Sequence, residues 1–124
     1  MRAVLLLCGA VLVATPVLAS DPPAATAQVC TGVKDRTPQG TAERFPATVG
    51  ELYCFSRLTN VSEKVLHVWF QGDREILRIE LPVKAAQWRT WSAKKISPGM
   101  TGPWRVEVRD AAGTVLATAG FTVE

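Results

Sequence analysis

The clearest alternation of apolar and polar side chains lies in residues 65–81. Gly72-Asp73 divides this segment into two runs and offers a two-residue turn with glycine first, as a type II′ β-hairpin requires. Pairing about that turn sets Trp69 opposite Ile76. The wholly apolar face of this hairpin is predicted to point into the core and comprises Leu66, Val68, Phe70, Leu77, Ile79 and Leu81. The face predicted to point outward comprises His67, Trp69, Arg78 and Glu80, together with Val65 and Ile76.

Further strands follow from runs of apolar, aromatic and β-branched residues bounded by turn signals. Residues 104–109 alternate strictly, and Asp110-Ala111-Ala112-Gly113 supplies a turn before the last apolar run. Residues 87–96 place Trp88 and Trp91 on opposite faces, and their pattern does not decide which tryptophan is buried. The predicted strands outside the hairpin span residues 28–34, 52–58, 87–96, 104–109 and 115–123.

No stretch shows a helical period, so about seven short strands joined by turns predict an all-β fold. We expect a small, immunoglobulin-like antiparallel β-sandwich that forms a single domain over residues 28–124. Residues 35–50 contain several glycines and prolines and are predicted to form a long loop. Residues 20–27 show no periodic pattern and are predicted to form a flexible leader.

The first residues, 1–19, have the pattern of a secretory signal peptide. Arg2 precedes an apolar run, residues 3–14, which Pro16 and small residues follow. A membrane anchor needs about 20 consecutive apolar residues, and this run is interrupted before that length. We expect cleavage at the end of this segment, with a second possible site after Ala27. The protein would then be periplasmic or secreted, with no stable membrane insertion after cleavage.

Cysteine usage fits the same compartment. Cys8 would leave with the signal peptide, so Cys30 and Cys54 would remain in the mature chain. An even cysteine count in an exported protein suggests one disulfide, worth roughly 3 kcal/mol for a loop of this size. The alternative is a pair of buried free thiols that pack as small apolar residues. No C-x-x-C motif supports a redox role.

The charge balance gives little sign of a nucleic-acid partner. The net charge is +3, and loss of Arg2 with the signal peptide would lower it by one unit. Basic and acidic residues are interleaved rather than gathered into runs. Nucleic acid is therefore not predicted as a partner.

Six short motifs, in the same order, resemble the bacterial DUF2914 family. This resemblance implies a small β-rich domain, found alone after a signal peptide or attached to larger envelope proteins. It implies no activity, and no catalytic residue is carried over. The motifs are Cys30–Pro38, Leu52–Phe55, His67–Phe70, Trp88–Ser92 with Lys94, Gly102–Val106 and Phe121–Val123.

Catalytic and metal chemistry lack the residues they need. A hydrolase triad requires a nucleophile, a histidine and an orienting acid, and His67 is the sole histidine, predicted to lie beside Arg78. A cupredoxin-type copper site needs two histidines beside a cysteine. We therefore expect a protein that is not an enzyme and that carries no cofactor or metal.

A binding surface is the remaining hypothesis. Tryptophan rings beside arginines could stack on sugars or contact an acidic partner. The alternative is that arginine stems merely cover tryptophans that pack against the rest of the fold. We predict an exported binding or protein-interaction module whose partner is an envelope protein or, alternatively, a cell-wall glycan such as peptidoglycan. The candidate binding residues are His67, Trp69, Arg78, Trp88, Arg89 and Trp91.

Overall fold

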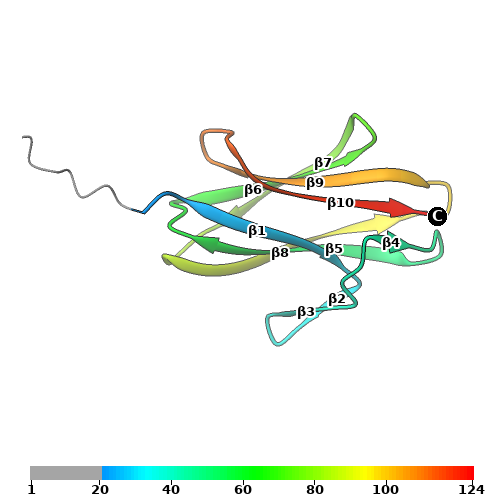
Figure 1. The fold of residues 1–124 in the computed structure, drawn as a ribbon, viewed down its shortest axis with the longest axis horizontal. Coiled ribbons are helices and arrows are strands. Elements are labelled where there is room, and N and C mark those ends of the chain that lie inside the picture. Colours follow the sequence, from blue (N-terminus) through cyan, green and yellow to red (C-terminus); the bar gives the residue numbers. More distant parts are fainter. Residues whose placement is uncertain (1–20) are drawn as a thin grey trace, which may run out of the picture.

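The computed structural model describes residues 21–124, which form two packed β-sheets (Figure 1). The predicted signal peptide lies outside the described residues. The three-stranded sheet has the order β1 (Ala24–Cys30), β5 (Gly50–Thr59), β8 (Gln87–Ile96). The five-stranded sheet has the order β4 (Arg44–Phe45), β10 (Val115–Val123), β9 (Gly102–Asp110), β6 (Lys64–Gln71), β7 (Arg74–Pro82). A hairpin of β2 (Gly32–Lys34) and β3 (Thr37–Gln39) projects from the three-stranded sheet.

The predicted all-β sandwich is confirmed. Seven strands are long, namely β1 and β5 to β10, and every pairing is antiparallel except the short β4 beside β10. Two predicted boundaries were wrong: β1 already begins at Ala24, inside the segment expected to be a flexible leader, and residues 35–50 contain β3 and β4 rather than loop alone. No helix able to cross a bilayer occurs in residues 21–124.

Aromatic side chains fill the space between the sheets at the end that holds the C-terminus. The Phe121 ring lies 6.0 Å from Phe45, 6.2 Å from Trp69 and 5.9 Å from Trp104, measured between ring centroids. The strict alternation of β9 places Trp104 and its apolar neighbours inward, as predicted. Burial of such large apolar surfaces is the main stabilising term of a small sandwich.

The face assigned to β6 was wrong. Next to the turn the pairing agrees with prediction, since Gln71 lies opposite Arg74. A β-bulge between Trp69 and Phe70 then leaves Ile76 without a partner and moves Trp69 opposite Leu77. Because side chains alternate with a period of two, this shift of one residue reverses which β6 face accompanies the apolar face of β7.

Strand β6 is consequently buried on both faces. Val65, His67 and Trp69 point between the sheets, where each is 0% exposed. Leu66, Val68 and Phe70 form a separate buried cluster on the outer side of the five-stranded sheet. Arginines from β9 cover it: the Arg105 guanidinium carbon lies 4.0 Å from the Phe70 ring centroid, and that of Arg109 lies 5.8 Å away.

Candidate functional site

The only histidine is held inside the sandwich by two serines of the facing sheet. His67 Nε2 lies 2.8 Å from Ser56 Oγ on β5, and His67 Nδ1 lies 2.6 Å from Ser92 Oγ on β8. Ser92 Oγ also accepts a hydrogen bond from Trp69 Nε1 at 3.1 Å. One ring nitrogen donates and the other accepts, so a neutral imidazole satisfies every polar atom of this buried network.

This network lacks the features of a catalytic centre. Burial lowers the pKa of His67 from its ordinary value of 6.5 to about 4, because the charged imidazolium loses its hydration there. Neither ring nitrogen contacts a carboxylate in the described part of the chain. Ser56, like His67, is 0% exposed, so neither side chain can reach a substrate from the surface. The arrangement joins the two sheets through four side chains, namely His67, Trp69, Ser56 and Ser92.

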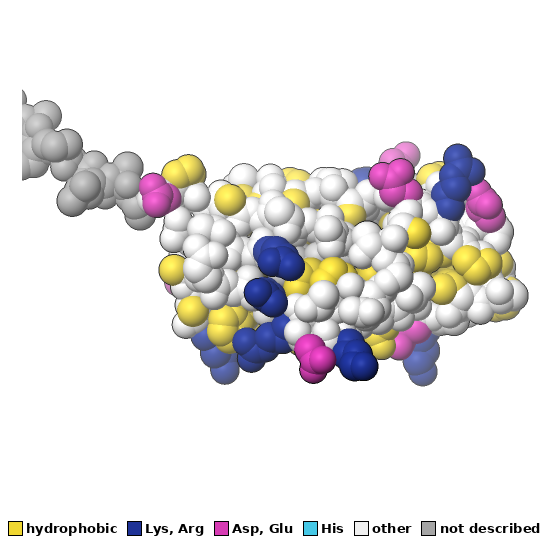
Figure 2. Space-filling view, turned by 60° about the horizontal axis from the view of Figure 1, so that its bottom comes forward, with side chains coloured by type: hydrophobic (Ala, Val, Ile, Leu, Met, Phe, Trp, Pro, Cys, Tyr) yellow, Lys and Arg dark blue, Asp and Glu magenta, His cyan; other side chains and the backbone are white. Residues whose placement is uncertain are grey.

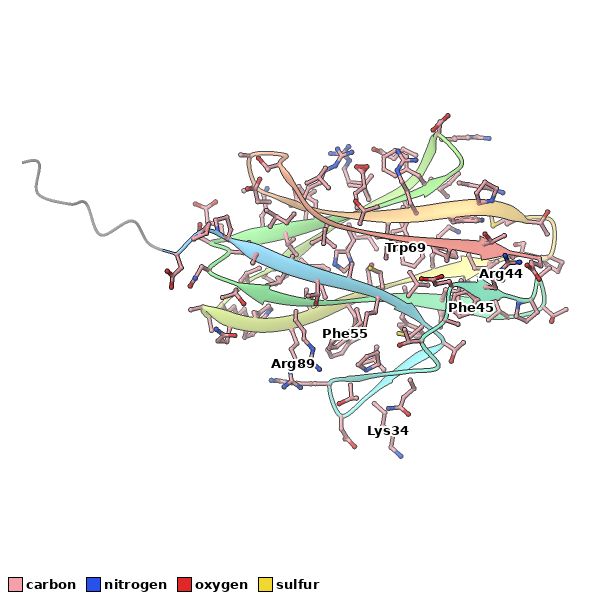
Figure 3. The ribbon with its side chains drawn as sticks, in the orientation of Figure 1. Lys34, Arg44, Phe45, Phe55, Trp69 and Arg89 are labelled. Carbon is pink, nitrogen blue, oxygen red and sulfur yellow. The ribbon has the colours of Figure 1, made fainter. Side chains whose placement is uncertain are left out.

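The six residues predicted to form one binding face are not brought together. His67 and Trp69 lie in the interior, and Arg78 lies on the outer side of the five-stranded sheet, where it pairs with Glu75 at 2.7 Å. Figure 3 shows Trp69 between the sheets, whereas Arg89 projects from the outer side of the three-stranded sheet. Trp88, Arg89 and Trp91 do line a common hollow.

The structure also decides between the two tryptophans of β8. Trp88 packs, half-buried, against the core cluster around Leu58. Trp91 lies on the opposite side of the sheet with 37% of its surface exposed. Its ring stacks on Phe55, with centroids 6.2 Å apart and an interplanar angle of 16°. Phe55 is buried beneath it, and the Arg57 guanidinium carbon lies 5.9 Å from the Phe55 centroid.

The β2–β3 hairpin adds Arg36 to this side of the molecule. Asp35 and Arg36 form its two-residue turn, with φ values of 51° and 56°. This left-handed geometry is the one that two-residue hairpins prefer, but asparagine and glycine are the residues that adopt it most readily. Arg89 Nη1 donates a hydrogen bond to the carbonyl oxygen of Arg36 at 3.2 Å, which ties the hairpin tip to β8.

Two open hollows flank this contact. The larger, of about 440 Å³, is lined by Arg36, Arg57, Leu58, Ala85, Gln87, Trp88 and Arg89. The second, of about 350 Å³, is lined by Arg36, Pro82, Lys84, Trp88, Arg89, Thr90 and Trp91. We call the region around the two hollows the basic surface, and define it as Arg36, Arg57, Lys84 and Arg89 with Trp88 and Trp91.

The cations of the basic surface are not paired with acids in the described part of the chain. Neither hollow is lined by a carboxylate. None of the four cations of the basic surface takes part in an ion pair within residues 21–124. On the far side of the molecule Arg105 and Arg109 both bond to Glu107, and Arg109 is the leading cause of the lowered pKa of that carboxyl. Figure 2, which turns the three-stranded side forward, shows Lys and Arg side chains gathered toward its left.

The sequence predicted the β8 residues of the basic surface as candidate binding residues, but not Arg36, Arg57 or Lys84. These residues come from three separate segments of the chain, and only the folded sheet and its hairpin bring them beside Arg89. The one local signal was Asp35, because an aspartate can begin a tight turn.

The predicted disulfide is absent. Cys30 lies opposite Tyr53, and Cys54 lies opposite Val29, so the two cysteines project from opposite faces of the same pair of strands. Both are buried free thiols. Burial raises the pKa of Cys54 to about 12 and also raises the pKa of Cys30, which keeps both protonated.

A family model described as "Protein of unknown function (DUF2914)" matches residues 62–123, which is half of the chain. The family prediction is thereby confirmed, although the match begins after the cysteine motifs that contributed to the resemblance. It covers β6 to β10, and with them Lys84, Arg89 and both β8 tryptophans. No curated protein matches the sequence.

Proposed function

Because the chain belongs to the DUF2914 family, whose description assigns no activity, we propose from its surface that it is a non-catalytic binding module with an anionic partner. The signal-peptide pattern of the first residues supports a place in the cell envelope. The basic surface is the contact site, and the sandwich behind it is the rigid support.

The unpaired charge of the basic surface is the observation that carries this proposal. Four exposed cations border two adjoining hollows without a carboxylate partner. Of the nine other cations in the described chain, five pair with acids, and the four that do not line neither hollow, namely Lys34, Arg74, Lys94 and Lys95. Like charges held close together repel, so their clustering costs stability. An anionic ligand would relieve that repulsion and gain charge-assisted hydrogen bonds from the guanidinium groups.

The burial of the histidine supports the proposal that this binding module is non-catalytic. The single histidine and its two serine partners are used to connect the sheets, and their neutral hydrogen bonds leave no general base facing the hollows. The basic surface itself offers cations and indole rings, and Thr90 adds a hydroxyl to the smaller hollow. These groups suit recognition better than proton transfer.

Charge reversal at the basic surface tests the proposal. We expect Arg57→Glu/Arg89→Glu to weaken binding of poly-L-glutamate about tenfold or more at physiological salt, measured by tryptophan fluorescence titration. Arg44→Glu/Arg74→Glu changes the net charge equally but lies outside the surface; Figure 3 shows Arg44 far from Arg89. Equal loss in the two double variants would show that only overall charge matters and would overturn the proposed site.

Cell-wall glycan binding is the second candidate, and the exposed Trp91 ring favours it. An indole that stacks on Phe55 and keeps 37% of its surface open could cover one face of a sugar ring. Titration with soluble peptidoglycan fragments would change Trp91 fluorescence if this is correct. Trp91→Leu should abolish that response, and an unchanged signal from the wild-type protein rejects the candidate.

A further inference from the structure

Strand β8 forms one edge of the three-stranded sheet. It pairs with β5 along its whole length, from Gln87 opposite Thr59 to Ile96 opposite Gly50, and no strand of residues 21–124 pairs with its other side. Its charged side chains, Arg89, Lys94 and Lys95, are all basic. An edge strand carries a row of backbone donors and acceptors that another extended segment can use.

The register identifies which backbone groups face away from β5. Asn60 N donates to Ala86 O at 2.8 Å across the end of this ladder. In an antiparallel ladder, hydrogen-bonded residue pairs alternate with non-bonded pairs. The bond between Asn60 and Ala86 makes the even-numbered residues of β8 the hydrogen-bonded ones. The N–H and C=O groups of Arg89, Trp91 and Ala93 therefore point away from β5, toward the open edge. The carbonyl oxygen of Lys95 points toward the same edge, and it accepts a hydrogen bond from Lys94 Nζ at 2.8 Å rather than from a residue of β5.

The smaller hollow of the basic surface borders this edge. Trp88 and Thr90 project from one face of β8, whereas Arg89 and Trp91 project from the other, yet all four line it. Residues from both faces of a strand share one hollow only along the strand's edge. Arg36, Pro82 and Lys84 complete its lining, so outward-facing backbone groups and three cations border the same space.

We propose that the anionic partner is an extended acidic peptide segment, which pairs with the open edge of β8 as an added strand. This inference rests on the proposed function and narrows its ligand class. Backbone hydrogen bonds at Arg89 and Trp91 provide the pairing, and carboxylates at alternate positions of the peptide lie against Arg36, Lys84 and Arg89. Trp91, which projects from the same face of β8 as Arg89, covers the aliphatic part of a neighbouring acidic side chain. A glycan could use the cations and the indole but could not continue the strand ladder.

Backbone methylation separates strand pairing from charge attraction. The probe is a synthetic peptide of about eight residues with glutamate alternating with valine, and fluorescence anisotropy reports its affinity. Two matched peptides carry N-methyl groups on one or the other alternating set of residues, which removes backbone donors without changing charge. Since only one set faces β8, we expect one methylated peptide to lose about tenfold or more in affinity and the other to bind nearly as the parent does.

The outcomes distinguish this inference from the function on which it rests. If both methylated peptides bind as tightly as the parent, charge alone holds the ligand and strand addition is wrong. If polygalacturonate binds through Arg57 and Arg89 but the acidic peptide does not, the ligand is a glycan: the anionic-partner function stands and this inference falls. If no polyanion binds, both fail.

Discussion

At the scale of single residues, His67 connects the two sheets as an uncharged imidazole. Its ring is 0% exposed, and both nitrogens bond to serine hydroxyls that can each donate or accept. A proton added to the ring would make both nitrogens donors in a site without an anion. Acidification should therefore act on the fold through this residue.

We predict that His67 makes the protein less stable as the pH falls from about 6.5 to about 4. In that interval the unfolded chain binds a proton at His67, whereas the folded chain, whose pKa is about 4, does not. Protonation thus favours the unfolded state, and the difference corresponds to a loss of about 3 kcal/mol in the free energy of unfolding across the interval. Urea denaturation at pH 7 and pH 4.5 measures this loss.

His67→Gln provides the control, because glutamine keeps hydrogen-bonding groups and does not titrate. The free energy of unfolding of this variant should be lower than that of the wild type at pH 7, and the difference between the two proteins should be smaller at pH 4.5. If the difference in the free energy of unfolding is the same at both pH values, the pKa of His67 does not differ between the folded and unfolded chains.

We predict that Arg36→Gly raises stability while weakening anion binding. Glycine adopts the positive φ of 56° without the steric cost of a side chain, which should add about 0.5–1 kcal/mol to the free energy of unfolding. The same change removes a cation shared by both hollows. Chemical denaturation and poly-L-glutamate titration measure the two effects.

Asp35→Gly is the matched variant for this turn. Its φ of 51° should also be relieved, but the residue lines neither hollow and carries no positive charge, so binding should persist. If both glycine variants bind equally well, Arg36 does not contact the ligand.

At the scale of elements, β6 shows how much one bulge decides. Five of the six residues from Val65 to Phe70 are apolar, so its own sequence does not alternate, and all six residues are buried. The hairpin, its turn at Gly72 and the inward face of β7 could be predicted from alternation and turn chemistry. The bulge could not, because no glycine or proline marks it, and it reversed the assignment of His67 and Trp69.

We predict that Trp69→Ala costs about 3–5 kcal/mol in the free energy of unfolding. The indole is fully buried, packs beside Phe121 and bonds to Ser92, so alanine would leave a cavity and remove one hydrogen bond of the Ser92 hydroxyl. Trp91→Ala should cost much less, because that ring is partly exposed. Urea denaturation of the two variants compares them, and equal costs would contradict the assigned faces.

At the scale of the whole molecule, the fold was more predictable than the site. Apolar alternation, turn residues and strand spacing depend on local sequence, and they predicted the sandwich. The basic surface depends on contacts between β5, β8, the β2–β3 hairpin and the connection after β7, which no local pattern reveals. Only its β8 members were identified beforehand.

We predict that a reducing agent leaves the stability of the folded domain unchanged. Cys30 and Cys54 lie on opposite faces of the β1–β5 pair, so no bond between them constrains the unfolded chain. Denaturation midpoints measured with and without dithiothreitol should coincide. A fall of roughly 3 kcal/mol on reduction would instead indicate a disulfide between them.

The charged side chains of β8 are all basic, which also affects the solubility of the protein and its choice of partner. Exposed edge strands tend to join identical copies of a protein edge to edge, which is a common route to aggregation. Two β8 strands aligned in this way would set Arg89, Lys94 and Lys95 of one copy against the same cations of the other. The charge that would attract an acidic strand therefore discourages self-pairing, and the edge can stay open without the protein polymerising through it.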